Sequence, residues 1–326
     1  MGLLRVSRSC LIRGLCTVSM VSALLVADFA LAAEQLKVIV PIPPGGSLDL
    51  VSRVLADQIG RGQGPTMIVE NRPGASAIVG TELVARATPD GKTLLASGTA
   101  LVINPYLHKT SYDPLASFAP ICQLASLPTV IAVSSQSPYA TLGALFDAAR
   151  VKPGELSLAS IGPGSTTHLA FEKLKREAKV DMTFVPYPGT APAFDAVLGQ
   201  HVTAYFGEAS FVATQVKAGT MRALATAAPQ RLQSLPGVST LAELGFADIM
   251  AGLWFGILAP AHTPQQTTER LATLYMAALQ APDVKAKLAD LGLVPVGLCG
   301  ADFGAFLRRQ FEDYGRIIAE VGIKAE

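Results

Sequence analysis

LKVIVPIPPGGSLDLVSRVLADQI, residues 36–59, is the stretch of sequence that decides the fold. It begins with the apolar run 36–40, passes through a loop rich in Pro and Gly, and continues as an amphipathic segment from Ser47. A strand, a glycine-rich loop and a helix in this order are typical of an α/β unit. Ser47 is a favourable N-cap, and the free N–H groups of a first helical turn suit an anion. We therefore expect an α/β protein with an anion-binding loop after its first strand.

The same alternation of strands and helices continues along the chain. The apolar runs that predict strands are 36–40, 66–69, 93–97, 156–159, 182–185, 202–206 and 223–227. The segments with helical periodicity are 47–59, 78–87, 141–150, 166–177, 191–198, 211–218, 265–281, 283–291 and 303–321, with one short strand at 293–296 among the last three. This spacing favours largely parallel sheets, in which ligands bind at the loops that follow the strands.

Two extended apolar stretches, 130–133 and 253–258, look like strands that cross between two lobes. The block between them is long enough to form its own βα layer. The predicted organisation is a discontinuous first lobe, residues 34–133 plus 253–326, and a second lobe, residues 134–252. A chain that crosses twice makes a hinged pair of lobes with a ligand cleft between them.

The first 33 residues have the features of a secretory signal peptide. Arg5, Arg8 and Arg13 precede an uncharged stretch, 14–27, and the small residues of Ala30-Leu31-Ala32 predict cleavage near Ala32 or Ala33. The surroundings of the cysteine in this segment, RGLC, match a lipoprotein site poorly. We therefore expect a periplasmic protein without a lipid anchor.

The charge balance of the mature chain excludes several classes of partner. Residues 1–33 hold three Arg and one Asp, so 23 of 26 basic and 24 of 25 acidic residues remain, for a net charge of −1. Such a chain has no long-range attraction for nucleic acid or anionic membranes. Two cysteines survive cleavage, Cys122 and Cys299, and export permits a disulfide between them. The sequence leaves open whether they pair or stay as two separate buried thiols.

Four loops rich in Gly, Pro, Ser and Thr are candidates for the ligand site. They span residues 41–49, 70–77, 97–99 and 160–168. The first and the last precede helices and would face each other across the cleft, so that two helix starts could hold one or two carboxylates. Asp49 and Arg53, four residues apart, are expected to pair on the helix surface.

Motifs for catalysis, cofactors and metals were sought and not found. No Gly-x-Ser-x-Gly elbow, P-loop or dinucleotide fingerprint occurs. Ser165 and His168 are three residues apart but have no apparent third partner, and His168 with Glu172 lacks a third metal ligand. His168 is expected to line or buttress the pocket. We therefore expect no enzyme activity, no cofactor and no metal.

Six motifs in the chain, in matching order, resemble those of one family. They are VPIPPGGSLD (40–49), VENRPGA (69–75), PDGKTLL (89–95), VPYPGTAPA (185–193), KAGTMRALA (217–225) and WFGILAPA (254–261). The chain resembles the Bug-type receptors of tripartite tricarboxylate transporters over nearly its whole mature length. It departs from them at Ile42, where an aromatic residue is usual, at Ser76-Ala77, which replaces a glycine pair, and at FGEA (206–209), where many members carry Phe-Asp-Ser.

The resemblance implies a class II periplasmic binding-protein fold: two βα domains joined by two crossover strands, with a ligand cleft between. It implies capture of a dicarboxylate, amino acid or aromatic acid and delivery to the membrane permease subunits of a tripartite transporter, or to a membrane sensor. The ligand-binding residues expected from the loops and from the resemblance are Pro44, Gly45, Gly46, Ser47, Asp49, Ala75, Ser76, Gly98, Thr99, Gly162, Gly164, Ser165, Thr166, His168, Tyr187, Gly207 and Glu208.

Two alternatives to a transport receptor remain. One is a periplasmic sensing module that signals a ligand to a membrane partner. The other is a periplasmic hydrolase or isomerase that uses Ser165, His168 or Glu208, against which the missing motifs argue.

Overall fold

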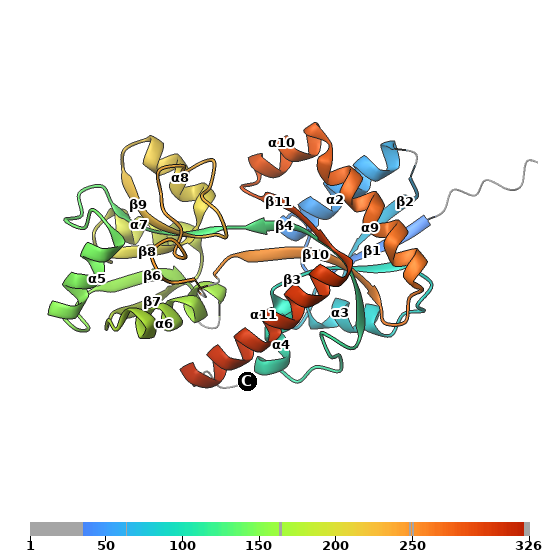
Figure 1. Cartoon of the computed structure of the whole chain (residues 1–326), viewed down its shortest axis with the longest axis horizontal. Helices are drawn as coiled ribbons and strands as arrows, with labels where there is room; N and C mark the ends of the chain where they lie inside the picture. Colours follow the sequence, from blue (N-terminus) through green and yellow to red (C-terminus); the bar gives the residue numbers. More distant parts are fainter. Residues whose placement is uncertain (1–34, 63, 163–164, 248, 250, 323–326) are drawn as a thin grey trace, which may run out of the picture. The chain divides into compact units, whose positions relative to one another are not determined.

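The computed structural model describes residues 35–62, 64–162, 165–247, 249 and 251–322 (Figure 1). The expected signal peptide, residues 1–33, lies outside the described residues. Within the described part, no helix combines the length and the apolar composition that crossing a membrane requires. The remaining chain is built around two mixed β-sheets with helices on both faces of each.

The first sheet has six strands, and segments from both ends of the described chain contribute to it. Its order is β11 (Val294–Cys299), β4 (Phe118–Leu127), β10 (Leu253–Pro260), β3 (Thr93–Gly98), β1 (Gln35–Val40) and β2 (Thr66–Asn71). The helices that cover it are α2 (Ser47–Arg61), α3 (Ile78–Ala85), α4 (Ala100–Leu107), α9 (Gln265–Gln280), α10 (Pro282–Asp290) and α11 (Gly300–Val321).

Both faces of this sheet are buried because side chains of a strand alternate between them. In β1, Val38 belongs to an apolar cluster with α2, α9 and α10. Its neighbour Ile39 points the other way, into a cluster with α3, α4 and α11. The run 36–40 is therefore continuously apolar because the strand is covered on both sides.

The second sheet has five strands, in the order β7 (Thr183–Tyr187), β6 (Ser157–Ile161), β8 (Ala204–Glu208), β5 (Thr129–Ser134) and β9 (Met221–Ala227). In β5, Ile131 and Val133 face one apolar cluster, and Val130 and Ala132 face another. The helices that complete these clusters are α5 (Leu142–Val151), α6 (Thr166–Ala178), α7 (Thr190–Leu198) and α8 (Ala209–Lys217).

The chain passes between the two sheets twice, at Pro128 and again before β10, so that it has the expected two-crossover α/β fold (Figure 1). The expectation of largely parallel sheets was wrong. Parallel pairing joins β1 to β3 and β6 to both β7 and β8, whereas β4, β5, β10 and the strands beside them pair antiparallel. Strand β4 leads from the first sheet to the second, and β10 leads back, so these neighbouring strands run in opposite directions. Residues 129–133, assigned from the sequence to the first lobe, pair with β8 and β9 in the second sheet.

Cys122 and Cys299 form a disulfide, which settles the question that the sequence left open. They lie directly opposite each other on β4 and the edge strand β11. The bond joins two positions 177 residues apart and ties the C-terminal segment to β4, the strand next to this edge of the first sheet.

The C-terminal helix α11 contacts helices that belong to both sheets (Figure 1). On α4, Tyr106 stacks on Phe311 of α11 with ring centroids 4.7 Å apart and donates a hydrogen bond to its carbonyl. On α6, Leu169 is fully buried in the cluster that contains α11, and Arg176 bonds both the carboxylate and the backbone carbonyl of Glu320. Helix α11 therefore holds α4 and α6 together.

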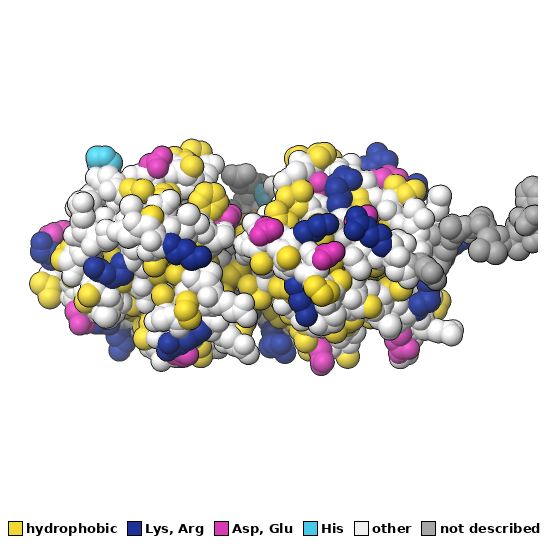
Figure 2. Space-filling view, turned by 90° about the horizontal axis from the view of Figure 1, so that it is seen from above, with side chains coloured by type: hydrophobic (Ala, Val, Ile, Leu, Met, Phe, Trp, Pro, Cys, Tyr) yellow, Lys and Arg dark blue, Asp and Glu magenta, His cyan; other side chains and the backbone are white. Residues whose placement is uncertain are grey.

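Figure 2 shows basic and acidic side chains interspersed over the face in view, as expected for a chain with a mature net charge near zero. Most described ion pairs join residues three or four apart in the sequence, such as Arg61 with Asp57 and Arg316 with Asp313. Exposed pairs of this kind contribute little to stability.

Candidate ligand-binding site

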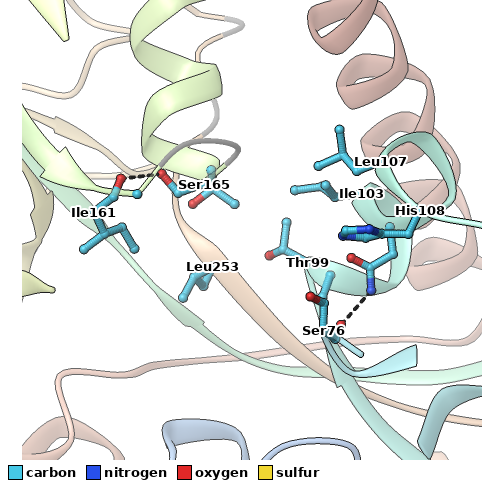
Figure 3. A pocket seen from close by; sticks show the side chains of 12 residues that line it. Ser76, Thr99, Ile103, Leu107, His108, Ile161, Ser165 and Leu253 are labelled. Atoms are coloured by element: carbon cyan, nitrogen blue, oxygen red, sulfur yellow. Dashed lines mark hydrogen bonds between the residues drawn. The ribbon is translucent and has the colours of Figure 1, made fainter. Parts of the chain in front are cut away.

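A cavity of about 380 Å³ lies between helix α4 and the loop that joins β6 to α6 (Figure 3). Its volume is at the low end of the range of small-molecule pockets, about 300–1,000 Å³. The residues that line it are Ser76, Thr99, Ala100, Ile103, Asn104, Leu107, His108, Ile161, Gly162, Ser165, Thr166 and Leu253. The lining residues therefore come from three parts of the chain: the loops and helix beside the first sheet, the end of β6 with the start of α6, and the start of the crossover strand β10.

One wall of the cavity is a single face of α4. Ala100, Ile103, Asn104 and Leu107 recur at helical spacing, and His108 follows at the C-cap. Figure 3 shows the side chains of Ile103, Leu107 and His108 on the same side of the space. This wall is apolar along most of its length and polar at Asn104 and His108.

The opposite wall is the end of β6 and the first turn of α6. Ser165 is the N-cap, and its hydroxyl accepts the backbone N–H of His168 at 3.2 Å and donates to the carbonyl of Ile161 at 3.0 Å. Thr166, the first helical residue, is 6% exposed and lines the cavity. The first N–H groups of the helix precede its hydrogen-bond ladder, so that they can donate to a bound anion.

The crossover strand closes the space between the two walls. Leu253 lines the cavity, and the backbone N–H of Trp254 donates to the hydroxyl of Thr99 at 3.3 Å. The side chain of Trp254 is 2% exposed and packs edge-on against Phe303 and Phe306 of α11. The floor of the cavity is thus connected to the core of the first sheet.

Ser76 reaches the cavity on an unusual backbone. Ala75, Ser76 and Ala77 have φ values of 44°, 54° and 77°, three consecutive left-handed residues without a glycine among them. Each such residue costs about 1–2 kcal/mol in a non-glycine. The side-chain amide of Asn104 donates to the carbonyl of Ser76 at 2.7 Å and helps to hold this turn against α4.

The cavity brings together five of the residues predicted from the sequence: Ser76, Thr99, Gly162, Ser165 and Thr166. Gly164 lies outside the described residues. The others are not among the lining residues, and their contact with a ligand stays a prediction; they are Pro44, Gly45, Gly46, Ser47, Asp49, Ala75, Gly98, His168, Tyr187, Gly207 and Glu208.

In the first glycine-rich loop, a side chain of the following helix α2 already accepts a backbone N–H. Asp49 is buried, and its carboxylate accepts the backbone N–H of Gly45, the Asn71 amide and the Arg53 guanidinium at 2.9–3.1 Å. Burial opposes its ionisation, but the bonds from Arg53, Gly45 and Asn71 outweigh this and hold the pKa of Asp49 below its ordinary value. Asp49 thus pairs with Arg53 and fixes the loop.

His168 lies on α6, three residues after its N-cap, and packs against strand β7. Its half-buried imidazole stacks on Phe184 with ring centroids 4.1 Å apart. Burial lowers the pKa of this imidazole, an effect that Glu172 opposes and Lys175 reinforces. On the neighbouring strand, the carbonyl of Tyr187 accepts the backbone N–H of Gly162, which places the lining loop beside β7.

Gly207 and Glu208 lie at the end of β8. A Cβ on Gly207 would stand 2.1 Å from the Tyr205 hydroxyl, so this glycine makes room for the buried Tyr205 ring. Glu208 is half-buried, and burial raises the pKa of its carboxyl. Glu208 is the N-cap residue of α8. The next residue, Ala209, donates its backbone N–H to the carbonyl of Pro128, at the first crossing between the sheets.

Sequence reasoning missed Leu253 and the whole α4 wall, namely Ala100, Ile103, Asn104, Leu107 and His108. Ile161 lies inside the candidate loop 160–168 but was not named as a ligand-binding residue. Pro105 within the segment argued against a helix. The signal that could have found it is the strand-end Gly98-Thr99 followed directly by the apolar run 100–103.

The chain is similar over most of its length to proteins of two other bacteria. It is 32% identical over 289 residues to "UPF0065 protein in tcbD-tcbE intergenic region" of Pseudomonas sp. (strain P51), which covers 88% of this chain and 86% of that protein. It is 30% identical over 295 residues to Protein BugT of Bordetella pertussis, with 90% of each chain covered.

Solved structures agree. A TctC solute-binding protein from Polaromonas, 27% identical, superposes with a TM-score of 0.83 and covers 89% of this chain and 100% of that one. MatC of Rhodopseudomonas palustris with bound malate is 26% identical, with a TM-score of 0.64, and covers 87% of this chain and 98% of that one. A second R. palustris protein, with adipate, is 26% identical, with a TM-score of 0.71, and covers 91% of this chain and 100% of that one. Residues 51–323 match the family model of the tripartite tricarboxylate transporter receptors. The chain therefore belongs to the TctC family of extracytoplasmic solute-binding receptors.

Proposed function

We propose that this receptor captures a small carboxylate in the periplasm and delivers it to the membrane permease subunits of a tripartite transporter. The observation that carries the proposal is the cavity between α4 and the start of α6, where neutral groups surround a helix start that can accept an anion. Malate and adipate, bound by two similar proteins, are ligands of this chemical class.

The proposed site works by neutral donors rather than by a cationic side chain. Among the described lining residues none is Lys or Arg. Arg72, the cation of the second glycine-rich loop, pairs instead with Glu70 at 3.0 Å and is 55% exposed. Charge-assisted hydrogen bonds from backbone N–H groups are worth about 1.5–3 kcal/mol each, and they cost little side-chain entropy because the fold already positions them.

Two lobes that close over the ligand are part of the proposal. The two separate sheets support this part of the proposal: β1–β4, β10 and β11 form one, β5–β9 form the other, and Pro128 lies between β4 and β5. Expected signal-peptide cleavage near Ala32 or Ala33 would place the mature protein in the periplasm, and amino-terminal sequencing of secreted protein tests this.

The site favours binding over catalysis. The Ser165 hydroxyl caps a helix by accepting a backbone N–H, and the imidazole of His168 stacks on Phe184. This is the geometry of a helix cap and its support, not of a nucleophile activated by a base. We expect no turnover of small esters by the purified protein.

Isothermal titration calorimetry with a panel of small carboxylates, combined with small-angle scattering, tests the function. A carboxylate should bind with micromolar or tighter affinity and reduce the radius of gyration. Arg72→Ala should leave affinity within a few-fold, and Gly162→Val should weaken it, because its Cβ would enter the cavity rim. If Arg72→Ala abolishes binding while Gly162→Val binds as before, the anion is held elsewhere.

Delivery has its own test. Deletion of the receptor gene should abolish uptake of the identified ligand by cells that keep the permease. If uptake persists and only a transcriptional response to the ligand is lost, the partner is a membrane sensor.

A further inference from the structure

The walls of the cavity carry more information about the ligand than its helix start does. The α4 face presents Ala100, Ile103 and Leu107, and Ile161 and Leu253 lie across from it and beneath it (Figure 3). Ile161 is 38% exposed although it is a large apolar residue on a strand next to a cavity. Covering an apolar surface inside a pocket with an apolar part of a ligand removes both from water, which makes binding more favourable.

Charge in the cavity is equally restricted. Among the described lining residues, none is Asp, Glu, Lys or Arg, and His108 is the one with a titratable side chain. The anion-accepting feature of the cavity is the first turn of α6, at Thr166. A second or third carboxylate on the ligand would lie away from this turn, beside a largely apolar wall whose described residues include no Lys or Arg, and an unpaired charge there is costly.

Two polar side chains on this side of the cavity already make hydrogen bonds within the protein. The Asn104 amide donates to the carbonyl of Ser76, and the Thr99 hydroxyl accepts the backbone N–H of Trp254. These bonds hold the wall together and reduce what it can offer to a second polar group on the ligand.

We propose that the ligand of this receptor is a monocarboxylate with a hydrocarbon body, aliphatic or aromatic. Its carboxylate lies at the start of α6, and its hydrocarbon part lies against Ile103, Leu107 and Ile161. The proposal rests on carboxylate capture at this cavity and narrows the chemical class of the ligand. It distinguishes this chain from the similar proteins with bound malate and adipate, both of which are dicarboxylates.

Calorimetry with matched acids on the purified mature chain tests the proposal. In the series acetate, butyrate, hexanoate, affinity should rise about 3- to 4-fold with each methylene, as expected from the burial of a CH₂ group. Hexanoate should bind about 10-fold or more tightly than adipate, which has the same number of carbons and one more charge. Benzoate should bind more tightly than citrate.

Variants at the wall assign the preference to named residues. Ile161→Thr should weaken hexanoate about 5-fold and leave acetate within 2-fold, because only the longer acid covers this side chain. Leu107→Thr should act in the same direction from the opposite wall. Val151→Thr is the matched control: Val151 is 80% exposed on α5 and is not among the cavity residues, so this variant should bind both acids as the wild type does.

The outcomes separate this inference from the function on which it rests. Binding of adipate or citrate more tightly than hexanoate overturns the inference but leaves carboxylate capture intact. If His108→Asn then abolishes that preference, the imidazole recognises a second carboxylate. An Ile161→Thr variant that binds hexanoate as tightly as the wild type also overturns it. If no acid in the series binds, the proposed function fails and the inference with it.

Discussion

Removing the disulfide between β4 and β11 should lower the stability of the protein by several kcal/mol. The perturbation is the double variant Cys122→Ala/Cys299→Ala, compared with the wild type in oxidising and reducing buffer. The bond joins positions 177 residues apart, more than half of the 326-residue chain. A cross-link between distant positions restricts the unfolded ensemble, and alanine leaves no buried hydroxyl behind.

The magnitude follows from the length of the closed loop. Chain-entropy arguments for a loop of 177 residues give about 17 cal/mol/K, or about 5 kcal/mol at 25 °C, which is an upper value because native disulfides more often contribute about 2–4 kcal/mol. The value of about 5 kcal/mol applies only if the two cysteines can move far apart in the unfolded chain without the disulfide. We expect a loss of about 3–5 kcal/mol, with a larger urea m-value because the unfolded chain is more expanded.

Urea unfolding followed by far-UV circular dichroism, with and without dithiothreitol, measures the effect. Reduced wild type should match the double variant, apart from the side-chain difference at the fully buried Cys122. Thiol titration of denatured, unreduced protein should find no free thiol in the mature chain, since the other two cysteines precede the expected cleavage site. Two titratable thiols, together with an unfolding midpoint that dithiothreitol does not move, would refute the pairing.

Three further variants probe other features. Ala77→Gly should raise the free energy of unfolding by about 0.5–1 kcal/mol because the native φ of 77° suits glycine, and Ala77→Val should lower it; equal stability of both variants in urea would contradict the left-handed turn. Arg176→Ala should lower the free energy of unfolding more than Glu320→Ala does, because Arg176 also bonds the Glu320 backbone carbonyl. In a double-mutant cycle the two side chains should couple by about 0.2–1 kcal/mol, since both are about half exposed. A larger loss for Glu320→Ala would contradict the bond to the backbone carbonyl. Burial raises the pKa of Glu208 above its ordinary 4.5, so its ionisation costs stability as the pH rises above that value, and Glu208→Gln should stabilise the protein more at pH 7 than at pH 4; a pH-independent difference would place this carboxyl in solvent.

Much of the architecture could be predicted from the sequence because hydrophobic periodicity is a local property. The runs 36–40 and 93–97 are strands β1 and β3, and the segment 166–177 is helix α6, each within two residues. The two crossing points were found for the same reason, since a strand that connects two cores is apolar and flanked by turns.

Helix α4 and strand β4 escaped this reasoning because each contains a proline. Pro105 lies inside α4, and Pro120 lies in β4. Tertiary contacts outweigh the local preference in both elements: Tyr106 of α4 stacks on α11, and β4 pairs on both sides. The largest wall of the cavity therefore could not be read from local pattern.

The first glycine-rich loop illustrates the other limit of sequence reasoning. Its composition marks a loop whose backbone N–H groups are available to an anion. The carboxylate that takes one of them is Asp49, four residues further along the same chain. Whether a donor faces a ligand or a neighbouring side chain depends on three-dimensional geometry, which spacing alone does not specify.

The position of Trp254 should let its intrinsic fluorescence report ligand binding. It is the one tryptophan in the chain, and it immediately follows Leu253, which lines the cavity. Its backbone N–H donates to the hydroxyl of the cavity residue Thr99. Its indole ring is buried among Phe303 and Phe306, so the empty protein should emit at short wavelength without interference from a second indole. A ligand that moves the crossover strand changes the surroundings of this single fluorophore. Loading and release can therefore be followed in real time on unlabelled protein.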